Sequence, residues 1–434
     1  MRDILLLLIV FSSIPFILKR PYIGILMFAW ISYMNPHRLT WGIAYDFPFA
    51  ALILAVTAIG LLITKDMKKL PSGYFVIYVW IAWAVWMNFT TPFALEPEVA
   101  ASEWERAVKI QLVSFLTIML LQSKERLMIF IWVVALSVGF YGIKGGVFTI
   151  LTQGNYLVWG PEGTFFSGNN GLAIALLMVL PLIRFLQVES DNKWIKLFLI
   201  GSMILCALSV IASYSRGAFL AAAAVAFYLL LKSRHKIVIA PVLILSAVSM
   251  LWFMPEKYFD RLETIETFEE DRSAMGRINA WYFAFNVAED NPITGGGFGV
   301  FRPGTFLRYA PDPLDYHDAH SIYFEVLGEH GFIGLALFLL LGISTLLLAR
   351  STAKITKKIE DLHWAYNLVN MLHVGVIAYA VGGLFLGLAY FDLYYHLIAL
   401  VILTRLLVDQ HLAESGINDT RATASREAPR STYD

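Results

Sequence analysis

The chain has 434 residues, of which 58% are hydrophobic and only 15% carry a charge. Soluble domains are about 45–50% apolar and about 25% charged, so this composition excludes an ordinary soluble protein and indicates a polytopic membrane protein. The formal net charge is zero, and bulk electrostatics therefore give no reason to expect a nucleic-acid partner. The one cysteine, Cys206, lies in an apolar run and cannot form an intrachain disulfide.

A membrane-spanning helix needs about 20 mostly apolar residues, and the chain contains a series of such runs. The first run has no small-residue cleavage site, so we expect a retained segment rather than a signal peptide. Because Pro21 breaks a helix, residues 3–35 are interpreted as one interrupted crossing, which gives about twelve spans; two crossings there would give thirteen. The candidate spans are residues 3–18, 22–35, 47–64, 73–91, 107–122, 127–149, 169–187, 194–213, 217–231, 237–254, 331–349, 365–387 and 389–408.

Lys and Arg are concentrated in alternate short loops, which the positive-inside rule places in the cytoplasm. The segment 255–330 then lies outside, and the tail 409–434, which is rich in Ser, Thr, Ala and charge, lies inside and is expected to be disordered. The sequence therefore predicts an all-α polytopic membrane protein of about twelve transmembrane helices with one large, partly helical outer loop. Membrane helices occupy residues 1–254 and 331–408, on either side of that loop.

Two arginines are candidates for binding an anion. Arg216 lies between two apolar runs, in a turn predicted to face outward, and its guanidinium matches phosphate in a bidentate fork. The alternative for Arg216 is a side chain that extends to the membrane interface. Arg277 opens a predicted helix with Ser273 as its N-cap, and the alternative for Arg277 is a surface ion pair with Glu270 or Asp271.

Apolar residues follow Arg277 at helical spacing, at Ile278, Trp281, Tyr282 and Phe285, and the helix is expected to end at Asn291-Pro292. A helix of this kind is typical of the membrane interface. The run Gly295-Gly296-Gly297-Phe298-Gly299 lacks the Gly-Lys-Ser/Thr of a P-loop. We interpret it as a tight or flexible turn, although its amides could approach a phosphate.

His320 is the candidate general base. Asp318 could cap a helix from Ser321 to Glu329 that is closed by Gly331, with His320 in the first turn. A neutral imidazole can accept a proton from a hydroxyl. The alternatives are a structural histidine and a metal site formed by Asp315, His317, Asp318 and His320. Glu325, Glu329 and His330 are interpreted as helix-surface or helix-end residues.

Together, one base and two arginines at the outer end of an apolar bundle suit a substrate with a long lipid, a pyrophosphate and a group to transfer. Neutralising the pyrophosphate leaving group would be the main electrostatic contribution. Deprotonating the acceptor hydroxyl would be the second. Arginines can supply the positive charge, so this chemistry requires neither a metal nor another cofactor.

The chain resembles the O-antigen ligase superfamily, which includes O-antigen ligases, polymerases and O-oligosaccharyltransferases. The N-terminal part is similar to the O-glycosylation ligases associated with exosortase systems. The resemblance to the superfamily covers residues 160–400, and the N-terminal motifs lie before this range. One difference is Ser321, where the family often has Asn. The residues that carry it are Gly163-Thr164-Phe165, Asn169-Asn170, Ser215-Arg216-Gly217, Gly276-Arg277, Trp281, Pro292 to Gly295, His320-Ser321, Glu329-His330-Gly331 and Gly334, with Pro21-Tyr22, Asn35-Pro36-His37 and Trp41 in the N-terminal part.

The resemblance implies a metal-independent, inverting transfer of a glycan from an undecaprenyl-pyrophosphate carrier, in the bacterial inner membrane and on its periplasmic side. It implies His320 as the base and Arg216 and Arg277 as diphosphate contacts. The acceptor would be a hydroxyl of a lipid A core sugar or of a protein. Further candidate site residues are Tyr316, His317, Trp281 and Asn170.

Two other functions remain open at this point. A polymerase would extend the glycan on the same carrier and share the chemistry of a ligase. A non-catalytic lipid-glycan transporter would favour ionisable residues along a path at the membrane midplane. The candidates lie at the outer end instead, although His373, Asp392 and His396 lie within the last two spans.

Overall fold

A computed structural model describes residues 1–65, 69–164, 166–232 and 272–415. This part of the chain is helical, and apart from one isolated bridge between Gly160 and Gly168 it forms no β-structure. The predicted span 237–254, residues 255–271 of the predicted outer loop and the predicted tail from residue 416 lie outside the described residues. The prediction of an all-helical protein is confirmed for the residues described.

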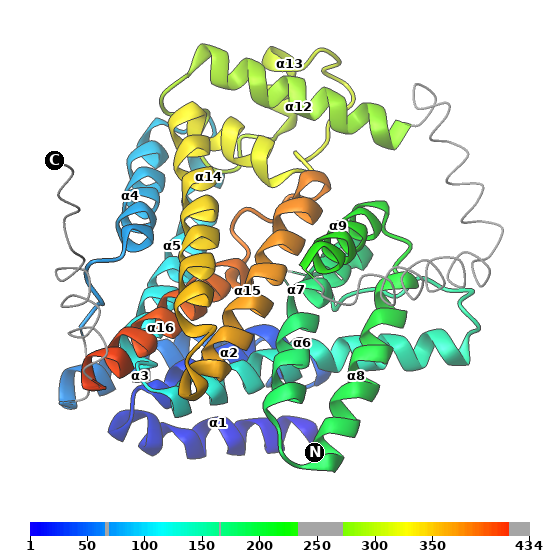
Figure 1. The fold of residues 1–434 in the computed structure, drawn as a ribbon. Coiled ribbons are helices and arrows are strands. Elements are labelled where there is room, and N and C mark those ends of the chain that lie inside the picture. Colours follow the sequence, from blue (N-terminus) through cyan, green and yellow to red (C-terminus); the bar gives the residue numbers. More distant parts are fainter. Residues whose placement is uncertain (66–68, 165, 233–271, 416–434) are drawn as a thin grey trace, which may run out of the picture.

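Figure 1 shows how the helices of the described residues are arranged. Short 3-10 helices lie at Pro36–Leu39, Thr91–Phe93, Glu360–Leu362 and Gly383–Phe385, the last labelled η4. The α-helices are α1 (Arg2–Lys19), α2 (Tyr22–Met34), α3 (Phe49–Ile63), α4 (Phe75–Thr90), α5 (Pro97–Leu120), α6 (Lys124–Leu151), α7 (Gly168–Glu189), α8 (Lys193–Ile211), α9 (Arg216–Lys232), α12 (Arg272–Asp290), α13 (Pro303–Tyr309), α14 (Ile322–Thr356), α15 (His363–Gly382) and α16 (Asp392–Glu414).

Seven helical segments of the described residues are long and apolar enough to cross a membrane, and each corresponds to a predicted span. Three shorter apolar helices correspond to the predicted spans 22–35, 47–64 and 217–231. The total of about twelve crossings stays a prediction. The seven segments are Phe75–Phe93, Lys124–Leu151, Gly168–Glu189, Lys193–Ile211, Ile322–Thr356, Glu360–Phe385 and Asp392–Glu414.

Two boundaries differ from the prediction. The segment between the predicted spans 73–91 and 107–122 is not a simple loop, because α5 begins at Pro97 and continues into the second of these spans. Proline fits the first turn of a helix, where its missing N–H has no partner to lose. The last helix continues to Glu414, past its predicted end at residue 408.

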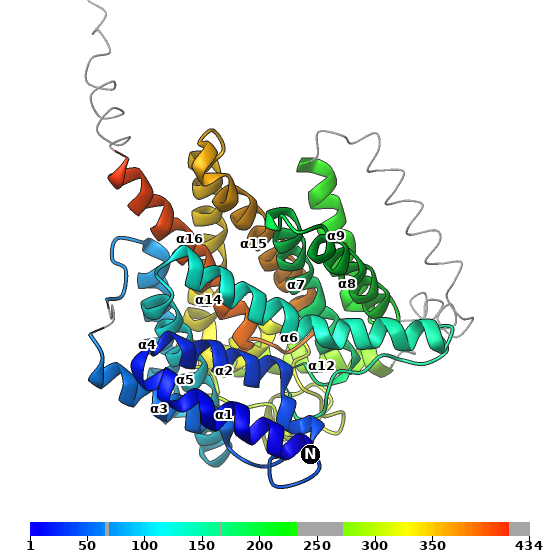
Figure 2. The same cartoon turned by 90° about the horizontal axis from the view of Figure 1, so that it is seen from below.

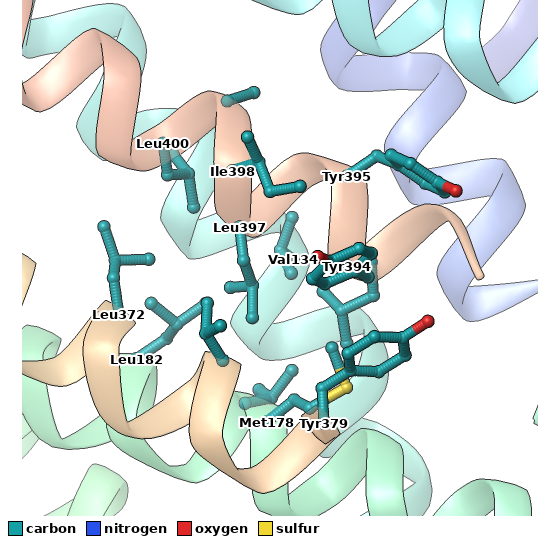
Figure 3. Close-up of a cluster of buried hydrophobic side chains, with 14 of the residues drawn as sticks. Val134, Met178, Leu182, Leu372, Tyr379, Tyr394, Tyr395, Leu397, Ile398 and Leu400 are labelled. Atoms are coloured by element: carbon teal, nitrogen blue, oxygen red, sulfur yellow. The ribbon is translucent and has the colours of Figure 1, made fainter. Parts of the chain in front are cut away.

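The main core forms where α6, α7, α15 and α16 meet (Figure 3). α16 is buried along most of its length. The stacked rings of Tyr379 and Tyr394, 4.1 Å apart, join α15 to α16. This core fixes the helices whose ends carry the candidate residues.

A smaller core joins α1, α2 and α3, which lie side by side along one edge of the molecule (Figure 2). The two helices on either side of Pro21 are therefore separate elements, each packed against α3. At the other end of the molecule, α12 and α13 lie across the end of α14 (Figure 1). α12 is thus oriented across the bundle rather than along it.

Candidate functional site

The segment that carries His320 is held on α12 by side-chain hydrogen bonds. The Nδ2 of Asn279 donates to the backbone carbonyls of Asp312 and Asp315 at 2.8 and 2.9 Å. Its Oδ1 accepts from the Asp312 amide at 2.9 Å. The indole Nε1 of Trp281 donates to the Ala319 carbonyl, also at 2.9 Å. α12 therefore positions the whole stretch between Asp312 and Ala319.

α12 ends at Asp290, as predicted, but it begins at Arg272, so Ser273 lies inside the helix rather than at its N-cap. The face that packs into the protein is Ala280, Phe283, Ala284 and Val287. The predicted apolar stripe lies beside it. Of that stripe, Tyr282 and Phe285 are exposed, whereas the Trp281 ring stacks on Phe324 at 5.0 Å.

His320 adopts a backbone conformation that is unusual for a residue with a side chain. Its φ is 43°, in the left-handed region, which costs about 1–2 kcal/mol for a non-glycine residue. The helix that follows begins at Ile322 with Ser321, not Asp318, as its N-cap, and Ser321 makes no side-chain capping bond. The expectation that Asp318 caps the helix and that His320 lies in its first turn is therefore wrong. Strained residues of this kind gather at functional sites.

The surroundings of His320 favour a neutral imidazole. Burial has the largest effect and lowers the pKa of His320, and the positive charge of Arg277 lowers this pKa further. Asp318 acts in the opposite direction, and His317 adds a smaller lowering effect. A neutral, half-buried imidazole can accept a proton. Arg277 and His320 therefore share one electrostatic environment.

Tyr316 and His317 support this segment. The His317 Nε2 lies 2.9 Å from Asp315 Oδ1, and its ring packs on Gly276, where a Cβ atom would come within 2.2 Å of the ring. Tyr316 donates its hydroxyl to the Phe301 carbonyl at 3.0 Å. Its pKa is raised by burial and by Asp318.

In the part of the chain that the structure describes, no three His, Cys, Asp or Glu side chains are grouped to hold a metal ion. The alternative metal site at Asp315, His317, Asp318 and His320 is therefore not formed by these side chains.

A cavity of about 420 Å³ opens beside this segment. Asp318 and Ala319, the two residues before His320, line this cavity. His320 itself is not among the lining residues. The walls of the cavity carry both cationic and acidic side chains. The remaining lining residues are Glu103, Arg106, Gly299, Phe301, Arg302, Tyr316, Glu325, Glu329, Gly387 and Tyr390.

The floor of this cavity is a buried hydrogen-bond network. The Tyr390 hydroxyl lies 2.5 Å from Glu329 Oε2 and 2.8 Å from His330 Nε2. Thr90 Oγ1 lies 2.7 Å from His330 Nδ1. The other oxygen of Glu329 accepts from the Gly299 amide at 2.7 Å, and Glu325 accepts from the Ala389 amide at 3.0 Å.

Glu329 and His330 lie at a helix end, directly before Gly331, as predicted, but they are buried rather than on the helix surface, and Glu325 is half-buried. Glu329 is 6% exposed and His330 is fully buried. A buried polar group is costly without hydrogen-bond partners, and the partners here, Thr90 and Tyr390, are distant in the sequence. The sequence signal was the run Glu329-His330-Gly331, with two ionisable residues at the start of an apolar segment.

The glycine run at 295–299 forms the predicted tight turn. The amides of Gly296 and Gly297 donate to the carbonyls of Gly328 and Glu329 at 2.8 and 2.9 Å. These two amides therefore cap the end of a helix inside the protein and do not face a ligand. The first part of α14 ends at Gly331, whose φ of 68° is not helical. This is the helix closure that the sequence predicted at Gly331.

Arg216 was expected within a turn, but it is the first residue of α9, directly after a turn at residues 212–214, and it is exposed. A helix N-terminus favours anions. A Cβ atom on the next residue, Gly217, would lie 3.2 Å from Phe385 of η4. η4 in turn packs on Ile322, two residues after His320, because a Cβ on Gly383 would come 2.5 Å from the Ile322 side chain.

The η4 segment thus connects the Arg216 turn to the His320 segment. Asn170 lies in the first turn of α7, and its neighbour Asn169 donates to the Ser213 carbonyl at 2.8 Å. The ion-pair partners considered for Arg277, Glu270 and Asp271, lie outside the described residues.

The seven candidate spans and the all-helical core of the described residues identify the protein as a multi-pass membrane protein. Residues 201–339, which include Arg216, Arg277 and His320, match the family model described as O-Antigen ligase. This match supports the O-antigen ligase superfamily for that part of the chain and indicates glycan transfer of the ligase or polymerase type. Residues 1–191 match a family of unknown function. A search of curated proteins finds none that matches the chain.

Proposed function

We propose that the protein is a glycosyltransferase that moves a glycan from a polyprenyl-diphosphate carrier to an acceptor hydroxyl. The observation that carries the proposal is His320, which is held in a strained conformation beside the 420 Å³ cavity, with its pKa lowered by burial and by Arg277. A base is needed where a hydroxyl attacks. The superfamily match supports a lipid-linked glycan as the substrate class.

In the proposed step, neutral His320 accepts the proton of the acceptor hydroxyl. The acceptor oxygen attacks the anomeric carbon and forms the new glycosidic bond. The bond from that carbon to the diphosphate oxygen breaks on the opposite face, so the configuration inverts. The carrier diphosphate leaves with the electron pair, and Arg216 and Arg277 stabilise its charge.

The cavity beside His320 is the proposed place of the glycan units next to the reacting carbon. Carboxylates such as Glu325 and Glu329 accept hydrogen bonds from sugar hydroxyls, and Arg106 and Arg302 donate them. The exposed aromatic residues of α12, Tyr282 and Phe285, suit the membrane interface, where a lipid carrier would enter. In the proposed topology this end of the bundle faces the periplasm, and the membrane is the bacterial inner membrane.

The proposed carrier is undecaprenyl pyrophosphate, and the proposed acceptor is a hydroxyl of a lipid A core sugar or of a protein. No metal or other cofactor takes part in the proposed step. A polymerase that extends the glycan on its carrier would use the same residues and differ in the acceptor. The N-terminal resemblance to the ligases associated with exosortase systems favours O-glycosylation of a separate acceptor.

The test uses purified full-length protein with carrier-linked glycan and a candidate acceptor. We expect His320→Ala to abolish transfer and to leave carrier binding intact. The matched control is His363→Ala, because His363 is an exposed histidine at the start of α15. Full transfer by correctly folded His320→Ala protein would show that His320 is not the base. A longer lipid-linked glycan, with no new conjugate, would identify a polymerase.

A further inference from the structure

A second cavity, of about 540 Å³, lies in the N-terminal half of the chain. Its described lining residues fall between Arg38 and Glu162. All of them lie within residues 1–191, the region that matches a family of unknown function, and outside the O-antigen ligase match. They are Arg38, Leu39, Tyr45, Tyr141, Lys144, Gly145, Phe148, Leu157, Val158, Trp159, Gly160, Pro161 and Glu162.

The walls of this cavity are held by the fold rather than by loose loops. The amide of Val158 donates to the Ala212 carbonyl at 3.0 Å, and the amide of Gly160 donates to the Gly168 carbonyl at 2.9 Å. Gly145 of α6 allows close packing, since a Cβ there would come 2.6 Å from the Val158 side chain. The cavity therefore exists before any ligand binds.

The loop that contributes Arg38, Leu39 and Tyr45 to the lining is fixed by the N-terminal helix. Asp3 Oδ1 accepts hydrogen bonds from the amides of Gly42 and Ala44 at 3.0 and 3.2 Å. These bonds hold the stretch between Arg38 and Tyr45 in place. Both parts of the cavity lining are therefore preformed, which lowers the ordering cost of binding.

Two cations line the cavity, against one acidic residue, Glu162, among the described lining residues. The guanidinium of Arg38 lies over the Tyr45 ring at 4.6 Å and pairs with the exposed Asp46 at 3.4 Å. Its Nε atom is buried and has no hydrogen-bond partner among the described residues. A buried donor without a partner is uncommon and indicates a missing acceptor. Lys144 is exposed on α6.

Aromatic rings make up much of the remaining lining. Trp159 is 65% exposed and Tyr45 is 39% exposed, so both present ring surface to a ligand. Tyr141 and Phe148 complete this aromatic lining. Flat apolar ring faces together with a few charged donors are typical of sites for a small polar ligand with apolar faces. A sugar ring has such faces in its C–H groups.

Hydrogen bonds join the lining of this cavity to the turn that precedes Arg216. Val158 is bonded to Ala212, as described above, and the Tyr214 hydroxyl donates to the Gly154 carbonyl. Tyr214 itself has a left-handed φ of 50°. A ligand in the cavity would therefore lie on the same side of the bundle as the proposed diphosphate contact.

We propose that this cavity binds an acidic saccharide unit, one that bears a carboxylate or a phosphate, with Arg38 and Lys144 as contacts for the anion and Trp159 and Tyr45 as contacts for the sugar ring. The assignment rests on the proposed function, because it takes the substrate of the enzyme to be a glycan. It specifies the substrate class further, as a glycan that carries negative charge.

The test measures binding directly, with full-length protein in nanodiscs of phosphatidylcholine. A uronic-acid disaccharide and its neutral hexose counterpart are titrated by calorimetry. We expect the acidic disaccharide to bind at least about tenfold more tightly, since charge-assisted hydrogen bonds are about twice as strong as neutral ones. Lys144→Gln should weaken its binding at least about fivefold, as should Trp159→Ala.

Lys144 is exposed, so its substitution preserves the fold, whereas Arg38→Gln also removes the contacts to Asp46 and Tyr45. Lys354→Gln, an exposed lysine near the end of α14, is the matched control and should change nothing. Equal affinity for the acidic and neutral disaccharides would overturn the proposal, as would wild-type affinity in both Lys144→Gln and Trp159→Ala.

A lipid phosphate is the competing occupant, because Trp and Tyr also gather at membrane interfaces. If the uronate disaccharide does not bind, and phosphatidylglycerol retained by the protein falls in Lys144→Gln, the cavity is a lipid site and the proposal is wrong. The inference and the proposed function fail separately. His320→Ala should bind the uronate disaccharide normally. Absence of glycan transfer by the wild-type protein would overturn the proposed function, and selective binding of the uronate disaccharide would still leave the cavity assignment standing.

Discussion

The indole Nε1 of Trp281 donates a hydrogen bond to the backbone carbonyl of Ala319 at 2.9 Å, and this bond joins α12 to the residue before His320. The Trp281 ring also stacks on Phe324, in the first turn of α14. Trp281 therefore contacts the chain on both sides of His320. It is a positioning residue whose polar and apolar contacts can be tested separately.

Trp281→Phe keeps an aromatic ring beside Phe324 and removes the donor to Ala319. A neutral hydrogen bond contributes about 0.5–1.5 kcal/mol, and the loss should loosen the backbone that holds His320. We expect kcat for glycan transfer to fall up to about tenfold, with KM for the carrier nearly unchanged. Steady-state kinetics measure both, with Trp194→Phe, an exposed tryptophan on α8, as the control. A change confined to KM would contradict a positioning role.

Gly331 is the point at which α14 is interrupted, and its φ of 68° suits glycine alone. A Cβ atom there would come within 2.7 Å of the backbone carbonyl oxygens of Pro292 and Ile293. Gly331→Ala should therefore cost more than the about 1–2 kcal/mol of a left-handed residue. Gly73→Ala is the control, since Gly73 also has a positive φ but has no atom within 4 Å of its Cβ position.

The midpoints of thermal unfolding in detergent, at one heating rate, compare the two glycine variants. We expect Gly331→Ala to lower the midpoint distinctly more than Gly73→Ala. Equal shifts in the two variants would mean that the contact with residues 292 and 293 adds nothing to the cost of the backbone conformation.

The local features of this region were predictable from the sequence. Helix periodicity and Pro292 indicated α12 and its end, and Gly331 indicated the closure before the last spans, because these signals act within a few residues. The start of α14 was missed, since Asp318 looks like an N-cap in the sequence. The structure has His320 in the left-handed region instead, a conformation that tertiary contacts such as the Trp281 bond impose.

The buried side of the site could not be predicted in the same way. His330 meets Thr90 and Tyr390, which are 240 and 60 residues away in the sequence. No local pattern specifies which distant polar groups will satisfy a buried one. The seven spans were recognisable because apolar length is a local property, whereas the cavities depend on how those spans pack.

The Tyr390 hydroxyl lies between Glu329 and His330, at 2.5 and 2.8 Å. Tyr390→Phe would leave the Glu329 carboxyl and the His330 ring without this partner. Leaving a buried polar group unsatisfied costs about 1–3 kcal/mol. We expect a lower unfolding midpoint and reduced transfer activity. Tyr282→Phe, which removes the hydroxyl of a tyrosine that is 58% exposed, is the control and should behave as wild type.

The pH dependence of transfer tests His320 together with its two charged neighbours. A general base is active when neutral, so activity should be lost as the pH falls through the pKa of His320. Burial and Arg277 lower that pKa from its ordinary value of about 6.5. The acidic limb of kcat/KM should therefore lie below about pH 6.5.

Two substitutions should move this acidic limb in opposite directions. Arg277→Gln removes a positive charge that lowers the pKa of His320, so the limb should shift to higher pH. Asp318→Asn removes a negative charge that raises it, so the limb should shift to lower pH. The position of the limb is independent of overall rate, and weaker substrate binding in Arg277→Gln does not obscure it. Arg184→Gln, at an exposed arginine of α7, should leave the limb in place. If neither Arg277→Gln nor Asp318→Asn moves the limb, a group other than His320 controls it.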